Sequence, residues 1–212
     1  MYVEFNLPIV PEMRTAVSNY WVQHYFVGSP SQNYQINALT TTYMRLVEAA
    51  IIEYGLGSTA LRQVWDDHAS MSFLNAMARS ISHFESCLTD MHRAINAYRR
   101  LRRHKSIDPL SVYLADQKPA FAADGIAGPV RQMRDDIHHL EEMVVEGRIS
   151  EGQFIALIPS GPEIPHPTEQ GQTIKTFDRL VIGDRELTFT NIAAWLEEMS
   201  AVAVRIAQYG SK

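Results

Sequence analysis

Residues 131–139 concentrate side chains that can hold an anion and move a proton. Arg131 and Arg134 carry guanidinium groups, Asp135 directly follows the second arginine, and His138 and His139 are adjacent. A guanidinium donates charge-assisted hydrogen bonds to anionic oxygens, and an imidazole titrates close to neutral pH, where it can act as an acid or a base. These residue types allow anion binding and proton transfer if the fold brings them together.

The same segment also allows a simpler interpretation, the solvated face of an ordinary helix. Asp135 and His139 have the i,i+4 spacing of a surface pair. Arg131 and His138 are seven residues apart and share a face, whereas Arg134 and His139 diverge by about 140° on an ideal helix. Arg134 and His139 therefore meet only if the first turn is irregular or if a second subunit contributes one of them.

Apolar residues at helical spacing predict the elements that position this segment. One stripe predicts a long helix over about 70–103, and another predicts a helix over about 38–54 that stops at Gly55. Residues 12–26 form a weaker helix candidate, and the connection at 104–125 holds at most a short helix. The segment itself lies on a further helix that ends at Gly147 and has the stripe Ile126, Val130, Met133, Ile137, Leu140 and Val144.

The C-terminal third has a different pattern. Its Pro and Gly content predicts a loop over 158–173, and two short apolar runs around Gly183 and Asp184 predict a β-hairpin within 179–189. Thr190 is the expected N-cap of a last helix that runs through Tyr209. The predicted fold class is all-α: a bundle of long antiparallel helices in a single domain, 1–212, with a small β-hairpin before the C-terminal helix.

Composition is that of a globular protein and argues against several classes of function. The 212 residues, 46% of them hydrophobic and 20% charged, suffice for the core of one domain. A formal net charge of −5 argues against a general nucleic-acid coat. No apolar run approaches a bilayer span, the N-terminus lacks a secretory pattern, and Cys87 is the only cysteine. We therefore expect a cytoplasmic protein without membrane contact.

The order of residues within the segment resembles a known family. The sequence RDDIHH, residues 134–139, matches the R-x4-H pattern, with a polar residue after the arginine, that marks the HEPN superfamily of helical nucleases. The longer pattern, from Arg131 through Met133 and Arg134 to His138 and His139, resembles the corresponding helix in the kinase-extension nucleases of the unfolded-protein-response sensor and the interferon-linked ribonuclease. The resemblance covers roughly residues 35–147, and the hairpin and helix at 177–209 have no counterpart in the family pattern.

The resemblance implies a metal-independent endoribonuclease without a cofactor, acting as a homodimer whose two motif helices face each other. In that mechanism Arg134 stabilises the transition state, His139 is the acid and base, and Asp135 orients the arginine or caps the local turn. Arg131 and His138 would bind phosphate. The implied partners are an RNA substrate and an antitoxin or other protein, in bacterial defence or a toxin–antitoxin system.

A second class of function stays open, a non-catalytic HEPN-like dimeric module that binds a ligand or a partner. Asp136 and Ile137 stand where the kinase-extension nucleases have positive residues, and many HEPN-like domains are thought to be non-catalytic. The bare pattern also recurs from Arg99 to His104, which we interpret as a basic helix end that could supply cations to an RNA path.

A third class is a haem or di-metal enzyme of the helical-bundle type. Asp135 and His138 have half of a di-iron carboxylate spacing, and Glu163 and His166 repeat it between prolines in the predicted loop. His83 and Cys87, one turn apart, could ligate a metal, but a buried pair without metal is the simpler interpretation. The sequence predicts no metal site. On the same helix, Glu85 or Arg93 could pair with the Arg/His set, most simply as a salt bridge.

Overall fold

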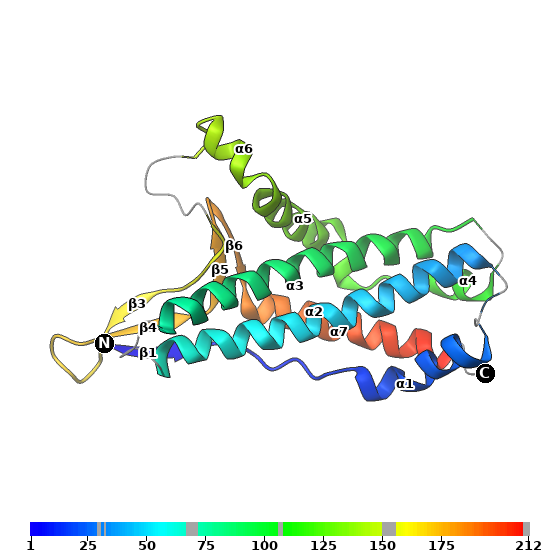
Figure 1. Cartoon of the computed structure of the whole chain (residues 1–212), viewed down its shortest axis with the longest axis horizontal. Coiled ribbons are helices and arrows are strands. Elements are labelled where there is room, and N and C mark those ends of the chain that lie inside the picture. The colour runs from blue at the N-terminus through cyan, green and yellow to red at the C-terminus, as the bar shows by residue number, and fades with distance from the viewer. Residues whose placement is uncertain (29–30, 32, 67–71, 106–107, 150–155, 210–212) are drawn as a thin grey trace. The chain divides into compact units, whose positions relative to one another are not determined.

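A computed structural model describes residues 1–28, 31, 33–66, 72–105, 108–149 and 156–209. These residues form a predominantly helical protein with seven α-helices and two small sheets in the described ranges (Figure 1). The elements divide between two compact units. The sheet unit comprises Met1–Ile9, Glu53–Ser86 and Arg131–Ala194, and the helical unit comprises Val10–Ile52, Cys87–Val130 and Trp195–Lys212.

The helices follow the predicted order. They are α1 (Arg14–Val22), extended by a π-helical turn (Gln23–Val27), α2 (Tyr34–Asp66), α3 (Ser72–Arg102), α4 (Pro109–Ala115), a 3₁₀ turn (Ala120–Ala122), α5 (Asp124–His138), α6 (Leu140–Val145) and α7 (Phe189–Tyr209). The start expected at residue 70 for the long helix lies outside the described residues. No helix within the described ranges has the length and apolar character that crossing a bilayer requires.

The prediction that the second helix stops at Gly55 is wrong, because α2 continues through Gly55 and Gly57. At Gly57 a Cβ would lie 3.0 Å from the Phe84 ring of α3, so the glycine permits close contact between the two helices. The Gly57 carbonyl also accepts a hydrogen bond of 3.0 Å from Ser80. Tertiary packing therefore outweighs the local signal for a helix end.

Within each unit, α2 and α3 run in opposite directions. In the sheet unit, Glu53 of α2 lies 2.7 Å from His83 of α3, and four residues further along α2 the Gly57 carbonyl bonds to Ser80, which precedes His83 on α3. In the helical unit, Gln35 near the start of α2 bonds to His104 after the end of α3, at 2.8 Å. The long antiparallel helices of the prediction are present.

The all-α expectation is incomplete, because each of two sheets has three strands. In one, β1 (Tyr2–Phe5) pairs in parallel with β4 (Thr173–Phe177), which pairs antiparallel with β3 (Glu163–Pro165). In the other, β5 (Arg179–Ile182) lies between β2 (Ile158–Ser160) and β6 (Arg185–Thr188). The predicted loop over 158–173 is thus wrong in part, since it contains β2 and β3. Between them, a Cβ at Gly161 would lie 2.0 Å from the Thr176 carbonyl oxygen.

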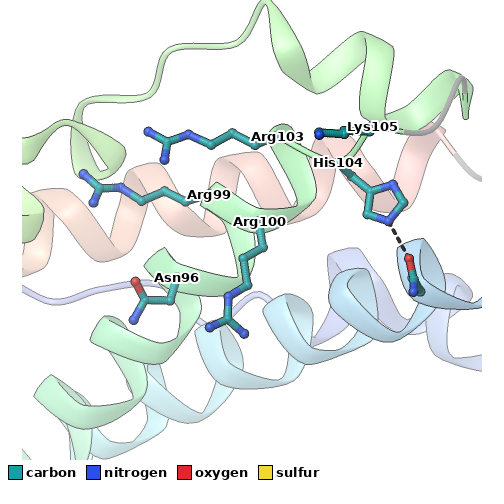
Figure 2. Close-up of a pocket in the computed structure, with 7 residues that line it drawn as sticks. Asn96, Arg99, Arg100, Arg103, His104 and Lys105 are labelled. Atoms are coloured by element: carbon teal, nitrogen blue, oxygen red, sulfur yellow. Dashed lines mark hydrogen bonds between the residues drawn. The ribbon is translucent and has the colours of Figure 1, made fainter.

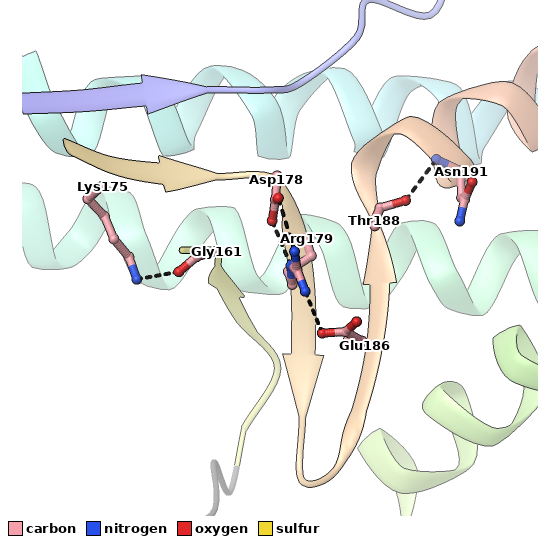
Figure 3. A network of polar contacts seen from close by, with 7 residues as sticks. All are labelled: Gly161, Lys175, Asp178, Arg179, Glu186, Thr188 and Asn191. Carbon is pink, nitrogen blue, oxygen red and sulfur yellow. Dashed lines mark hydrogen bonds and ion pairs between the residues drawn. The ribbon is translucent and has the colours of Figure 1, made fainter. Parts of the chain in front are cut away.

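The predicted hairpin is confirmed as β5 and β6, whose turn begins with Gly183 at φ 56°. The predicted N-cap at Thr190 is wrong: α7 begins at Phe189, two residues earlier than predicted, and the Thr188 hydroxyl accepts a hydrogen bond of 3.2 Å from the Asn191 N–H. Figure 3 shows this cap beside Arg179, which bonds to Asp178 at 2.7 Å and to Glu186 at 2.8 Å. These contacts tie the hairpin to the start of α7.

Each unit has an aromatic core. In the sheet unit, Phe84 and Phe189 have ring centroids 5.1 Å apart, and Tyr54 packs against both. In the helical unit, Tyr98 and Phe121 lie 5.2 Å apart, and burial raises the pKa of Tyr98 to about 12. The α7 residues expected in the core, Ile192, Leu196, Met199, Val202 and Ile206, are buried.

Candidate functional site

The predicted site lies where α5 ends and α6 begins. The helix is interrupted at His139, whose φ of −107° and ψ of 13° leave the α-helical range. The interruption is small, because the His139 N–H still bonds to the Asp135 carbonyl at 2.9 Å and the His139 carbonyl accepts from Met143 at 3.0 Å. The site therefore sits on one bent helix rather than in a loop.

The helix ends after α6 in the way the sequence predicts. Gly147 has a φ of 66°, and its N–H bonds to the Val144 carbonyl at 3.2 Å. The Arg148 N–H bonds to the Met143 carbonyl at 2.9 Å, which completes the two-bond pattern of a Schellman C-cap. The glycine stop is confirmed here, in contrast to Gly55.

Arg134 is the most constrained side chain of the site. Its side chain is 30% exposed, and Nη1 donates a hydrogen bond of 3.0 Å to the Asp135 carboxylate. Its Nε is buried and has no hydrogen-bond partner among the described residues. Asp135 thus holds one edge of the guanidinium, while a buried N–H remains for a further acceptor.

The structure separates the candidate residues into two directions on α5. Arg131, Arg134 and His138 fall on one flank of the apolar stripe, within about 60° on an ideal helix. Arg131 and His138 are exposed. On an ideal helix His139 diverges from Arg134 by about 140°, and in the structure its Nδ1 lies 3.0 Å from a carboxylate oxygen of Glu142. Within one chain, Arg134 and His139 therefore bind different carboxylates.

Asp136 lies on the other flank and contacts the hairpin. It forms an ion pair with Arg185 of β6, and the same arginine donates a hydrogen bond of 3.1 Å to Gln132. A pocket of about 170 Å³ beside this pair is lined by α5, α6 and the β5–β6 turn. Sequence reasoning missed Arg185, because no local pattern connects residues so far apart along the chain.

A second charged site occupies the end of α3, in the helical unit. An open pocket of about 690 Å³ is lined by Gln35, Asn96, Arg99, Arg100, Arg103, His104 and Lys105 (Figure 2). Arg99 donates to the Ala122 carbonyl at 2.7 Å and to Asp124 at 2.7 Å. The sequence predicted a basic helix end here, whereas the pocket depends on Gln35 from α2.

The residues considered for metal binding have other partners. His83 bonds to Glu53, and Cys87 is buried. His166 accepts a hydrogen bond of 3.0 Å from the Glu169 N–H and packs on Tyr2, with centroids 4.7 Å apart. In the described ranges, no cluster of three or more His, Cys, Asp or Glu could hold an ion.

The two polar residues of α3 considered for pairing also have other surroundings. Arg93 lies 3.8 Å from Asp90. Glu85 is half-buried, and burial raises the pKa of its carboxyl.

Comparisons with protein families, curated proteins and solved structures give no match for this chain. The candidate site therefore stands on its own residues: a partly buried arginine held by an aspartate, with an exposed arginine and histidine on the same flank.

Proposed function

We propose that the chain is a HEPN-like, metal-independent endoribonuclease that acts as a homodimer. The observation that carries the proposal is Arg134, whose guanidinium is held by Asp135 and keeps a buried Nε without a partner in the described structure. A guanidinium fixed in this way is suited to an oxyanion, because it is already oriented before the charge develops. Arg131 and His138 on the same flank favour a phosphate as that anion.

The proposed reaction needs no group beyond the protein and the RNA. The 2′-oxygen forms a bond to the adjacent phosphorus, and the bond from phosphorus to the 5′-oxygen breaks. One histidine takes the 2′-hydroxyl proton and then supplies a proton to the leaving 5′-oxygen. Arg134 stabilises the non-bridging oxygens. The products are a 2′,3′-cyclic phosphate and a 5′-hydroxyl.

The choice of histidine follows from the geometry of one helix. His138 is one turn from Arg134, on the same flank, and suits phosphate binding. His139 diverges from Arg134, so we assign the acid–base role to the His139 of a second copy facing Arg134. The homodimer and its role in defence or a toxin–antitoxin system in the cytoplasm derive from the HEPN resemblance.

An RNA cleavage assay in EDTA tests the proposal. The full chain is incubated with a mixed-sequence, end-labelled RNA, and the product ends are identified. Arg134→Ala should lower the rate by about 10²–10³, as the loss of one oxyanion donor does. His139→Ala should do the same, whereas Arg45→Ala, at an exposed arginine of α2, should not change the rate. Cleavage that survives both Arg134→Ala and His139→Ala excludes the assignment.

A non-catalytic dimeric interaction or ligand-binding module is the second candidate. It is favoured by α6, where Val144 is 52% and Val145 is 87% exposed. Exposed apolar side chains beside a charged face suit a protein contact. For this candidate, RNA stays intact at high protein concentration, and Val145→Asp weakens self-association measured by sedimentation while Arg134→Ala leaves it unchanged.

A further inference from the structure

The cationic pocket at the end of α3 is a site that the proposed cleavage chemistry does not use. Its lining has five basic side chains and two amides and contains no acidic residue. In a chain with a net charge of −5, a gathering of this kind is local rather than a general property of the surface. Cations at a helix C-terminus also interact favourably with the helix dipole, but that interaction requires neither a pocket nor so many charges.

The cations of the pocket differ in what they contact. Arg99 is used within the fold, since it binds the Ala122 carbonyl and Asp124. Arg100, Arg103 and Lys105 are exposed, and in the described part of the chain none of their side chains has a hydrogen bond or an ion pair. These three positive groups line one pocket, and each can bind an anionic group.

The spacing of these groups suits an extended anion. Asn96, Arg99, Arg100 and Arg103 follow the i, i+3, i+4, i+7 pattern and share one side of α3. Arg99 and Arg103 extend in the same direction in Figure 2, and residues one turn apart are separated by about 6 Å along the helix. Gln35 and His104, whose side chains are bonded to each other at 2.8 Å, also line the pocket.

We propose that this pocket binds the phosphate backbone of single-stranded RNA, with Arg100 and Arg103 as principal contacts. The pocket is open, and its lining has no aliphatic residue and no Phe, Tyr or Trp, so it lacks the apolar walls that enclose a small ligand and the large aromatic platforms on which bases stack. Five positive groups without such a surface favour the charged phosphate backbone, which every nucleotide carries. The choice of RNA rests on the proposed function, whereas the choice of phosphate rests on the pocket alone.

The test is a binding titration in which cleavage cannot interfere. A 2′-O-methyl RNA strand of about 16 nucleotides lacks the attacking hydroxyl, and its binding to the full chain is followed by fluorescence anisotropy at several salt concentrations. Arg100→Gln with Arg103→Gln removes two phosphate contacts. The slope of log K against log salt should become shallower by about 1.4, which is about 25-fold weaker binding at 0.1 M salt. Arg100→Lys with Arg103→Lys should retain most of the slope.

The matched control is Arg45→Gln with Lys118→Gln, which removes the same charge from exposed positions outside the pocket. An equal change in slope for the control and the pocket variant overturns the inference, and so does an unchanged slope for the pocket variant. The outcomes also separate the two proposals. If the pocket variant has a shallower salt slope but the protein never cuts RNA, the pocket proposal holds and the nuclease proposal fails. If the protein cuts RNA and the pocket variant keeps its slope, only the pocket proposal fails.

Discussion

The divergence of Arg134 and His139 on one helix makes the proposed site a product of two chains, and this has a quantitative consequence. Each site of a symmetric dimer would combine Arg134 of one chain with His139 of the other. Homodimers of Arg134→Ala or of His139→Ala then have two damaged sites. In a mixed dimer both substitutions fall in one site, and the other site is intact.

The expected recovery follows from counting these dimers. Equal amounts of the two inactive variants, after subunit exchange, give mixed dimers as half of the population, and each has one working site of two. Activity should therefore return to about a quarter of that of the unmodified protein. The assay is RNA cleavage in EDTA before and after brief incubation under conditions that allow exchange.

The control replaces one member of the mixture. The control mixture combines Arg134→Ala with a double variant that carries both Arg134→Ala and His139→Ala. No chain in this mixture has Arg134, so it should stay inactive. No recovery in the main mixture, although exchange is verified with differently tagged chains, would show that one chain supplies both groups. The reasoning from the helix geometry would then be refuted.

Three further predictions concern the fold. Gly57→Ala should lower the free energy of unfolding in urea by about 1 kcal/mol, because the clash of a Cβ 3.0 Å from the buried Phe84 ring outweighs the helix preference of alanine. Gly55→Ala should raise the free energy of unfolding by about 0.5–1 kcal/mol, because no atom lies within 4 Å of the added Cβ. Burial raises the pKa of Glu85, so folding stability falls as pH rises through the range in which carboxyl groups titrate. Glu85→Gln should therefore raise Tm at pH 7. It should have little effect in acid, where the carboxyl is protonated in both the folded and the unfolded protein. Thr188→Ala should destabilise the chain by about 1 kcal/mol in the same urea titration, through loss of the α7 cap.

The helices could be predicted because their signals are local. The apolar stripe of α3 repeats every three or four residues, and Phe84, Leu88, Met91 and Ile95 along it are buried as the period requires. Gly55 failed as a stop signal for a different reason. A glycine marks a helix end only when nothing beyond it packs, and α2 continues because residues such as Gly57 contact α3.

The strands at the two ends of the chain could not be predicted in the same way. Tyr2–Phe5 pairs with Thr173–Phe177 across most of the sequence, and neither segment has a turn that would place it beside the other. β3 includes Pro165, and Pro and Gly around it are typical of loops. The hairpin of β5 and β6 was predictable because its two strands and its turn are contiguous.

The candidate site shows the same division between local and distant contacts. Asp135 binding Arg134 depends on adjacent residues, and the sequence motif contained both. Asp136 looked unfavourable beside a polyanion, but its carboxylate is paired with Arg185 from the hairpin, a contact that no spacing within the motif reveals. The two acids thus have separate roles, one holding an arginine and the other anchoring α5 to β6.

In the proposed mechanism, this separation of roles decides which flank of α5 would receive RNA. On the Asp136 flank, Arg185 and the β5–β6 turn occupy the space beside the helix. The Arg134 flank carries two arginines, Arg134 and the exposed Arg131. Only one carboxylate, that of Asp135, is paired there, and it binds Arg134. A phosphate approaching this flank meets net positive charge and the partly exposed guanidinium of Arg134. The hairpin, which has no counterpart in the HEPN pattern, therefore favours the proposed chemistry by neutralising Asp136.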